Sequence, residues 1–587
     1  MIYLTNKQQL NEALEYLRPK EVLGLDTETT GLDPLSEKVL LIAVGDSENQ
    51  FVLDVAQLGE TINPFLKFIQ SKNVIKILHN AKFDYKMFKS NFNIDLENMK
   101  DTYLADCLLT QGQQGVSHTL ESCLDRHLNV SISKEEQTSF IDMEYGASFD
   151  IDQLNYAAND IKHLIPLYKI LNLSIKSRNM ATLAELEYET ARPTGDLELN
   201  GIYLDKDKWL GLKDQADSNR QDKKQILDTH FIKYCEKDED GLPIINYRSP
   251  KQLLPILRKI TGASIPSTNV QVLKRFSHPA IGALLSYREA EKKFSTYGEE
   301  FYNKHIRPDG RIHADFWQLG RAHTGRYASS NPNMQNIPKE LEYRAAFTVQ
   351  NKDYKIISAD FSGQELRLLA HISQEPKFLK ALETGVDLHT NSASLVFGVP
   401  YDQVSKEQRT AAKSITFGLV YGIGPKKLSE NLKIGYNDAL YLMKKYFKTF
   451  PEIKRALDRL ELQARNTHMA ISPLDGRQSD LADKDWNNRG AAAHALNIAK
   501  NLPFQGTGAS TTKLALCRIK HRFDENNYGS DAKLINVVHD EILVECKKSI
   551  VMEVAKIVEV EMVKAFKIYA PTVPMEVKAE IGNHWIH

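Results

Sequence analysis

The sequence predicts a multidomain α/β protein. Its 587 residues are too many for one hydrophobic core, so several domains are expected. Near the N-terminus, the apolar run Val22–Leu25 leads directly into Asp26 and Glu28, and further alternating runs continue a sheet. Near the C-terminus, Lys533–Cys546 contains two apolar, β-branched runs separated by a polar triplet, which is typical of a hairpin. Stretches of helical composition separate these two regions.

The composition is that of a globular protein, with 42% hydrophobic and 26% charged residues. The net charge of −1 gives no global basic character. The segment from Arg248 to Arg344, however, contains sixteen Lys and Arg but only eight Asp and Glu. A local basic zone of this kind is compatible with nucleic-acid binding. No apolar run reaches the roughly 18 residues of a membrane span, so none is expected.

The five cysteines are scattered and form no CxxC pair, which predicts neither a zinc site nor a disulfide framework. We expect reduced thiols in a cytosol-like compartment. The start of the chain lacks the apolar core of a signal peptide and the composition of a transit peptide.

Three short polar patterns lie in the first 160 residues. A carboxylate pair two residues apart in a strand faces one side, and polar residues four apart share one helical face. Each pattern alone is usually an ordinary solvated surface, but the three in this order are far more specific. They are DxE at Asp26 and Glu28, NxxxD at Asn80 and Asp84, and YxxxD at Tyr156 and Asp160.

This order resembles the proofreading 3′–5′ exonuclease domain of DNA polymerases, of the DEDD type with tyrosine in its third motif. The resemblance implies a ribonuclease H-like fold, a mixed sheet with helices, over residues 1–178. Tyr156 would orient the attacking water, Asn80 would support the substrate strand, and Asp101 is interpreted as structural. Clustered carboxylates repel one another without a cation, so metal is the natural neutraliser. The implied ligands of two divalent metals are Asp26, Glu28, Asp84 and Asp160.

Two further stretches place acidic residues at strand ends. In Lys355–His371, Asp360 stands where a predicted strand gives way to a helix. In the predicted hairpin, Asp540 and Glu541 lie at the tip next to His539. Carboxylates on a rigid sheet suit Mg²⁺, and two such ions about 3.5–4 Å apart serve in-line phosphoryl transfer. An acidic turn is the simpler reading of either stretch alone, but together they predict that Asp360 and Asp540 hold the metals.

SADFSGQELRLLAH and VVHDEILVE resemble the first and third palm motifs of family A DNA polymerases, the bacterial DNA polymerase I and phage type. The resemblance covers nearly the whole chain. It implies a right-hand polymerase domain over residues 183–587, with an antiparallel palm sheet and mostly helical thumb and fingers. The expected divisions are a thumb at about 203–297, a palm at about 298–380 and 500–587, and fingers at about 381–499.

The stretch Arg409–Gly422 carries two cations and two aromatics every four residues, hence on one helical face. Such a face can hold a triphosphate at one end and stack on a base at the other. An amphipathic helix with buried aromatics is the simpler alternative. The family resemblance assigns Arg409 and Lys413 to the phosphates, Phe417 to the sugar and Tyr421 to the templating base. His389 is a further candidate for the β-phosphate.

The polar loop Gly320–Pro338 combines neutral hydrogen-bond donors with arginines. Such a loop suits phosphates and the minor-groove edge, where acceptors recur whichever base pair is present. It resembles the primer–template loop of the family, and the Ala-rich run Asn487–Lys513 resembles the segment that touches the primer terminus. The implied DNA-binding residues are Arg326, Asn333, Gln335, Asn336, Asn501, Gln505 and His539, together with Asn80 in the first domain.

Glu365 resembles the family's steric gate, which with Tyr421 would leave no room for a ribose 2′-hydroxyl. Two departures from the family pattern affect nucleotide selectivity. Gly363 and Gln364 stand where bacterial members have Gln-Ile, and Thr416 replaces a frequent Asn. Gln364 is therefore also a nucleotide-binding candidate.

The resemblance implies a DNA-templated DNA polymerase that proofreads, using two Mg²⁺ at each site, with Mn²⁺ as a substitute. The expected partners are primer–template DNA and dNTPs, with no membrane and a monomeric chain; a helicase and a single-strand binding protein are candidate replisome partners. Because the first residues already belong to the exonuclease, no 5′-nuclease domain is expected. A replicative and a repair role both remain open. A single-subunit RNA polymerase is one alternative, and the DEDD unit and Glu365 argue against it. A DNA-end-binding scaffold with dead sites is another, and the presence of all six predicted metal carboxylates argues against it.

Overall fold

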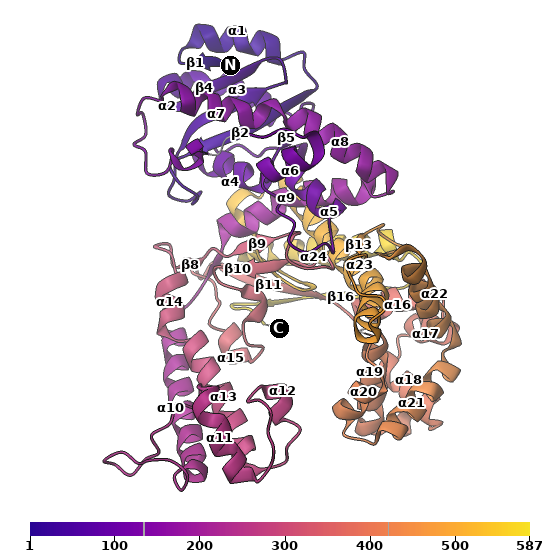
Figure 1. The fold of residues 1–587 in the computed structure, drawn as a ribbon. Helices are drawn as coiled ribbons and strands as arrows, with labels where there is room; N and C mark the ends of the chain where they lie inside the picture. Colours follow the sequence, from indigo (N-terminus) through magenta and orange to yellow (C-terminus); the bar gives the residue numbers. More distant parts are fainter. Residues whose placement is uncertain (133–134, 421, 587) are drawn as a thin grey trace. The chain divides into compact units, whose positions relative to one another are not determined.

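The computed structural model describes residues 1–132, 135–420 and 422–586, and divides into two compact units (Figure 1). Unit 1 comprises Met1–Gly201, Ala314–Gln335 and Asp353–Gly582. Unit 2 comprises Ile202–His313, Asn336–Lys352 and Asn583–His587. Within the described ranges, no helix combines the length and the apolar character needed to span a bilayer.

The N-terminal part of unit 1 is built on a six-stranded mixed sheet with strand order β1-β4-β3-β2-β5-β6. Strand β3 is apolar and buried along its whole length, which fits a strand covered on both faces. The mixed sheet predicted for this domain is therefore present. The strands are β1 (Ile2–Leu4), β2 (Val22–Thr29), β3 (Val39–Gly45), β4 (Gln50–Asp54), β5 (Ile75–Leu78) and β6 (Met99–Asp101).

Two apolar cores, one on each face of this sheet, hold its helices. One core takes side chains from α1 and α4, and the other takes them from α5, α7 and α8. Helix α7 begins at a capping box in which Asp150 and Gln153 satisfy each other's backbone N–H groups. The helices are α1 (Lys7–Leu17), α2 (Val55–Leu58), α3 (Asn63–Gln70), α4 (Ala81–Phe92), α5 (Thr102–Leu109), α6 (Leu120–Leu128), α7 (Ile151–Lys162) and α8 (Leu164–Ser177).

A four-stranded antiparallel sheet with order β14-β15-β11-β16 forms the centre of the rest of unit 1. Helices α9, α23 and α24 pack together and against this sheet. The antiparallel sheet expected between the first and third palm motifs is confirmed. The elements are α9 (Ala181–Asn200), β9 (Asp315–Trp317), β10 (Ala328–Ser330), β11 (Tyr354–Phe361), α16 (Gln364–Ser373), α23 (Arg489–Glu525), β14 (Ala532–Val538), β15 (Glu541–Lys547), α24 (Val551–Tyr569) and β16 (Val577–Gly582).

Between α16 and α23 the chain is mostly helical, as predicted for the fingers. Helix α18 packs on α19, and α20 packs on α21. A small two-stranded sheet, β12 with β13, follows these helices and contacts α22 and α23. The elements are α17 (Pro376–Glu383), α18 (Leu388–Phe397), α19 (Lys406–Val420), α20 (Pro425–Leu432), α21 (Tyr436–Thr449), α22 (Pro451–Thr467), β12 (Met469–Ile471) and β13 (Gln478–Asp480).

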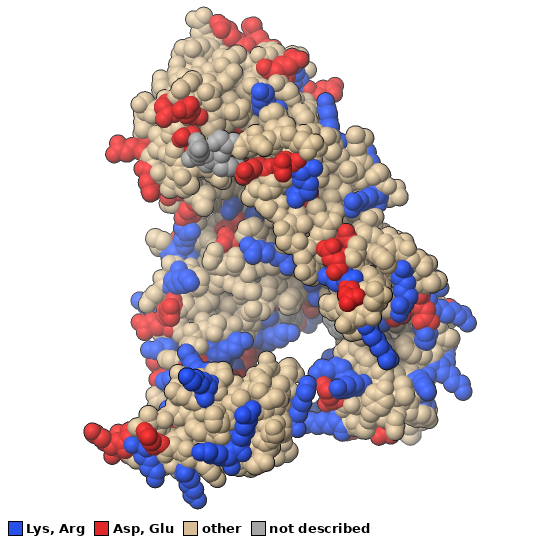
Figure 2. All heavy atoms as spheres, viewed as in Figure 1, with Lys and Arg blue, Asp and Glu red and all other residues tan. Residues whose placement is uncertain are grey.

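Unit 2 is mainly helical, with the long helix α10 packed along α13. Its apolar core combines side chains of α10, α11 and α13, and Trp209 stacks on Phe301 at 4.9 Å between ring centroids. Figure 2 shows Lys and Arg spread over the visible face around α11 to α13. The elements are β7 (Ile202–Tyr203), α10 (Lys206–Phe231), α11 (Pro250–Thr261), α12 (Val270–Leu273), α13 (Pro279–Thr296), α14 (Glu299–His305), β8 (Arg311–Ile312) and α15 (Leu341–Arg344).

Candidate active sites

Three carboxylates of the first domain converge at the end of β2. Asp26 and Glu28 lie two apart on this strand, and Asp160 comes from α7. One ligand oxygen of each lies within 4.8 Å of the other two. Three negative charges this close favour a bound cation, and carboxylate oxygens are the ligands that hard divalent ions prefer. The donor set therefore fits the metal site predicted from the sequence.

Tyr156 lies one turn before Asp160 on α7 and belongs to the same group. Its side chain is buried. Burial, and then the nearby carboxylates of Asp160, Glu28 and Asp26, raise the pKa of Tyr156 far above its usual range. The tyrosine therefore stays protonated and can act as a hydrogen-bond donor beside the carboxylate cluster.

Asp84 takes a different position from the three clustered carboxylates. It is buried on α4, and its Oδ1 accepts a hydrogen bond of 2.7 Å from the Thr27 hydroxyl. Burial raises the pKa of Asp84 to about 7. Asp84 is not part of the group whose oxygens lie within 4.8 Å of one another. Its role as a metal ligand stays a prediction.

Asp101 has the structural role that the sequence suggested. Its carboxylate accepts backbone hydrogen bonds from Asn80 and Ala81 at 3.0 and 2.9 Å. It also caps α5 by accepting from Tyr103 and Leu104. Asn80 itself lies at the start of α4 with φ +66°, a conformation that asparagine tolerates better than most residues. Asp101 thus fixes the backbone that carries the NxxxD pattern.

The second acidic site lies on the four-stranded sheet. Strands β11 and β15 are antiparallel, with Asp360 directly opposite Glu541. Directly opposed residues have Cα atoms about 4.5–5.5 Å apart and point to the same face. Asp540 precedes Glu541 in the two-residue turn between β14 and β15, where His539 has φ +57°. The pairing therefore brings Asp360 together with the hairpin tip, as predicted.

The hairpin differs from the prediction in one detail. The sequence suggested a three-residue tip, but Val538 pairs with Glu541, so only His539 and Asp540 form the turn. Glu541 is the first residue of β15 and is buried, whereas Asp540 is half-exposed. The shorter turn follows from the positive φ of His539, which closes a tight hairpin.

Gln335 joins the predicted primer–template loop to this hairpin. Its Nε2 donates to the Val537 carbonyl at 3.0 Å, and its Oε1 accepts from the His539 backbone N–H at 3.1 Å. Asn333 in turn accepts a hydrogen bond from the Gln335 backbone at 3.0 Å. Asn336 lies in unit 2, where its carbonyl accepts from Tyr297. The side-chain amide of Gln335 thus joins the loop to the β14–β15 hairpin.

Arg326 and Glu365 form an ion pair at the start of α16. Beside them, Gln364 is buried and its Nε2 has no hydrogen-bond partner among the described residues. Gly508 on α23 makes room for this side chain, because a Cβ there would lie 2.7 Å from Gln364 Oε1. The departure of Gln364 from the family pattern is therefore accommodated by a glycine on the facing helix.

The predicted phosphate-binding residues gather on α18 and α19. Arg409 makes two hydrogen bonds to Asp387, at 2.9 and 3.0 Å. The His389 ring lies 5.5 Å from Phe417, and Lys413 Nζ lies 5.9 Å from the same ring. Asp387 and His389 also line a cavity of about 230 Å³ beside α16. Tyr421 lies outside the described residues.

His389 gives a testable pH dependence. Burial is the main cause that lowers its pKa from 6.5 to about 4. The unfolded chain binds this proton below pH 6.5 while the folded chain does not, so stability is complete above pH 6.5 and falls as the pH drops toward 4. We expect the melting-temperature difference between the native chain and His389→Asn to shrink between pH 7.5 and pH 5. His521→Asn, at an exposed histidine, is the control. If the melting-temperature difference between the native chain and His389→Asn were the same at both pH values, His389 would not be a buried, neutral imidazole.

Asn501 and Gln505 lie on α23, one helical turn apart. Asn501 is half-buried, its Oδ1 is buried without a hydrogen-bond partner among the described residues, and Gln505 is 9% exposed. An uncompensated amide acceptor of this kind is available to a ligand. Their assignment to the primer terminus stays a prediction.

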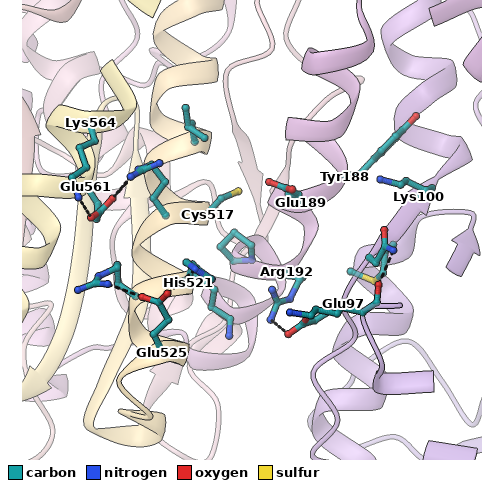
Figure 3. Close-up of a pocket in the computed structure, with 18 of the residues that line it drawn as sticks. Glu97, Lys100, Tyr188, Glu189, Arg192, Cys517, His521, Glu525, Glu561 and Lys564 are labelled. Carbon is teal, nitrogen blue, oxygen red and sulfur yellow. Dashed lines mark hydrogen bonds and ion pairs between the residues drawn. The ribbon is translucent and has the colours of Figure 1, made fainter. Parts of the chain in front are cut away.

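A larger cavity, of about 810 Å³, lies between β6, α9, α23 and α24 (Figure 3). None of its lining residues is a predicted site residue. Several of its cations are already neutralised: Glu561 binds both Arg518 and Lys564, and Arg192 binds Asp95 at 2.7 Å. Arg192 thereby joins α9 to the first domain, and Arg518 and Glu561 join α23 to α24.

Sequence reasoning missed a buried group of charges around Glu187. Arg477 and Lys513 both bind this carboxylate, and all three side chains are fully buried. Arg477 follows a Gly in the turn before β13, and Lys513 lies on α23. No local pattern marks them, because the partners are joined only by the fold. Arg477 also lies directly against Gly325.

Comparisons with known proteins identify both parts of the chain. Residues 217–587 match the family model "DNA polymerase family A", and residues 1–176 match "3'-5' exonuclease". DNA polymerase I of Aquifex aeolicus is 32% identical, with 99% of each chain covered. DNA polymerase I of Borreliella burgdorferi is 29% identical over 99% of this chain, which spans 64% of that longer relative.

A solved structure has the same fold. It is the polymerase domain of Pol1 from M. smegmatis in complex with DNA primer-template and dNTP, with a TM-score of 0.85, 24% identity, and coverage of 100% of this chain and 99% of that one. The resemblance inferred from the motifs is confirmed. The chain belongs to DNA polymerase family A and is a DNA-directed DNA polymerase with a 3′–5′ exonuclease domain.

Proposed function

We propose that the chain adds deoxynucleotides to a primer 3′ end at the site formed by Asp360 and the β14–β15 hairpin. Misinserted nucleotides would be removed at the cluster of Asp26, Glu28 and Asp160. The observation that carries the proposal is the pairing of Asp360 with Glu541, since it joins two motifs far apart in the sequence into one acidic edge. Gln335 anchors the primer–template loop to the same hairpin.

Family A polymerases and their exonuclease domains use divalent metals. We infer two Mg²⁺ at each site, with Mn²⁺ able to substitute. Asp360 and Asp540 would hold the ions of the polymerase site, and Asp26, Glu28, Asp84 and Asp160 those of the exonuclease. Bound there, the ions would neutralise charge on phosphate oxygens and on the attacking oxygen.

Arg409, Lys413 and His389 would bind the triphosphate of the incoming nucleotide. They lie on two packed helices, and the His389 ring and Lys413 Nζ lie 5.5 and 5.9 Å from the centroid of the Phe417 ring. In the structure Arg409 is bound to Asp387, so a triphosphate would have to replace this carboxylate as its partner. Both residues of the pair are two-fifths exposed, which keeps the cost of that exchange small.

Glu365 would exclude a ribose 2′-hydroxyl from the nucleotide site. Its side chain is largely buried at the start of α16 and is held by Arg326. A fixed carboxylate is a better steric barrier than a mobile one. This arrangement supports a preference for deoxynucleotides.

The exonuclease assignment predicts the effect of Asp160→Asn. The substitution removes one of three clustered charges with little change in shape, so we expect hydrolysis of single-stranded DNA to fall by about 10³-fold, or about 4 kcal/mol. Primer extension should be retained. Asp152→Asn, on the exposed first turn of the same helix, is the matched control. Equal activity in the two variants would count against a site at Asp160.

Extension of a long primed template with dNTPs, and in parallel with NTPs, tests the function as a whole. The proposal expects long products with dNTPs and strongly reduced extension with NTPs. Efficient NTP incorporation would instead indicate an RNA polymerase, and binding without any extension would indicate a scaffold. The DNA and dNTP seen in the M. smegmatis structure are the partners we propose here.

A further inference from the structure

Arg477 is a fully buried arginine that holds two segments of the chain together. Its Nη2 donates to Glu187 Oε1 on α9 at 2.8 Å and to Ser510 Oγ on α23 at 3.1 Å. Lys513 also binds Glu187, with Nζ at 2.8 and 2.7 Å from its two oxygens. Asp475 lies 3.6 Å from Arg477 Nε and adds a second negative charge. These contacts hold the guanidinium group of Arg477 through its Nη2 and Nε atoms.

The other side of this guanidinium lies against the primer–template loop. Gly325 has φ +73°, and a Cβ at this position would lie 2.3 Å from Arg477 Nη1 and 2.5 Å from its Cζ. Nη1 is buried and has no hydrogen-bond partner among the described residues. The loop backbone therefore rests directly on the guanidinium, and only a glycine allows the approach.

The loop is held on the same support at two neighbouring points. Lys513 Nζ donates to the Gln318 carbonyl at 2.9 Å, and it lies 5.5 Å from the Tyr327 ring centroid. The Tyr327 hydroxyl is 2.7 Å from the Thr194 hydroxyl on α9. Lys513 thus contacts the chain on both sides of Gly325, at Gln318 just before the loop and at Tyr327 within it.

The residue after Gly325 reaches the nucleotide site. Arg326 forms the ion pair with Glu365 described above. Because Gly325 and Arg326 share a peptide plane, a shift of the Gly325 backbone moves the base of the Arg326 side chain. The side-chain hydrogen bonds and ion pairs of Arg477 go to Glu187, Ser510 and Asp475, so its effect on Glu365 and the hairpin must pass through the loop.

We propose that Arg477 is a positioning residue for DNA synthesis: it supports Gly325 and thereby sets where Arg326 holds the sugar-excluding Glu365. The inference rests on the proposed function, since the roles of Arg326 and Glu365 are part of it. Arginine is required because its planar group both binds Glu187 and supports the loop, whereas lysine offers a single point charge.

The first test compares Arg477→Lys and Arg477→Met with the native chain. Misplacing a binding group by about 1 Å can cost about 10²-fold. We expect kcat/KM for dNTP incorporation to fall by about 10- to 100-fold, and the preference for dNTPs over NTPs to fall by about tenfold. Hydrolysis of single-stranded DNA should be unchanged. Arg477→Lys still provides a positive charge to pair with Glu187. It allows the test to be made even if the methionine variant does not fold.

Lys520→Met is the matched control for a purely structural effect. Lys520 is 8% exposed and binds Asp95, Asp196 and Asp524 at 3.0, 3.5 and 2.5 Å, and none of these partners lies in the loop. Its loss should lower the melting temperature and leave the dNTP preference intact. A purely structural Arg477 would behave in the same way, so unchanged nucleotide preference in folded Arg477 variants would overturn the proposal.

A double-mutant cycle tests the contact itself. Gly325→Ala alone should impair extension, because its Cβ meets the guanidinium and its φ is strained. In an Arg477→Ala background the contact is gone, and the added cost of Gly325→Ala should be clearly smaller. Additive effects would show that the two residues do not act through each other, which would contradict the proposal.

Arg326→Ala separates failure of this inference from failure of the proposed function. If Arg326→Ala and Glu365→Ala leave nucleotide preference unchanged, the proposed roles of these residues are wrong. If they reduce it and the Arg477 variants do not, the proposed function stands and the inference about Arg477 is wrong.

Discussion

Replacing Asp540 by asparagine is expected to abolish primer extension and to leave hydrolysis of single-stranded DNA intact. Asparagine keeps the size of the side chain, so the two-residue turn of the hairpin should persist. What is lost is one of the negative charges that balance divalent cations at the site. We expect extension to fall by at least about 10³-fold, which corresponds to about 4 kcal/mol of barrier. Extension and hydrolysis should be measured on one preparation.

Asp531→Asn is the matched control for this prediction. Asp531 lies at the opposite end of the same hairpin and forms an exposed ion pair with Lys547 at 2.7 Å. The same substitution there should change neither activity, because exposed ion pairs contribute little. Parallel loss of extension and hydrolysis in Asp540→Asn would instead mean that the two reactions share one site or that the variant is misfolded.

Glu187→Gln is expected to cause the largest loss of stability. Glu187 binds Arg477 and Lys513, and none of the three side chains is exposed. Removing the charge leaves two buried cations without their shared carboxylate, and Asp475, 3.6 Å from Arg477 Nε, compensates them only in part. Breaking a buried pair in this way costs about 3–5 kcal/mol. A lower denaturation midpoint for the first unfolding transition would report the effect.

Glu561→Gln is the control that isolates burial. Glu561 also binds two cations, Arg518 and Lys564, but these are 35% and 53% exposed. They can turn to solvent when the carboxylate is lost, so we expect a cost of about 1 kcal/mol or less. If the two substitutions were equally destabilising, burial of the cations would not be the cause of the Glu187 effect.

The acidic residues could be found from the sequence because each lies in a local strand or helix pattern. Asp26 and Glu28 follow the apolar run Val22–Leu25 within β2, and Asp360 lies near the end of β11. The apolar pattern of each segment therefore predicts the strand that carries these carboxylates. The family resemblance then supplied the pairing of Asp360 with the hairpin, which the sheet register reproduces. The exact length of the turn at His539 was not predictable, since it depends on one backbone angle.

The long-range contacts could not be predicted in this way. Arg477 and Glu187 are 290 residues apart, and neither has a motif of its own. The pairing of Arg409 with Asp387 was also missed, because the same helical face that suits a phosphate suits a carboxylate. Asp84 matches its motif, yet its carboxylate bonds to Thr27. These contacts depend on how distant segments pack together, and the local pattern of apolar and polar residues in the sequence does not reveal them.

Anomalous scattering from crystals grown with primer–template DNA and Mn²⁺ tests the central claim most directly. We expect manganese at two separate places, one between Asp360 and Asp540 and one among Asp26, Glu28 and Asp160. Manganese at the Asp26 cluster but none beside Asp360 and Asp540, in crystals with a primer end bound at the hairpin, would contradict it.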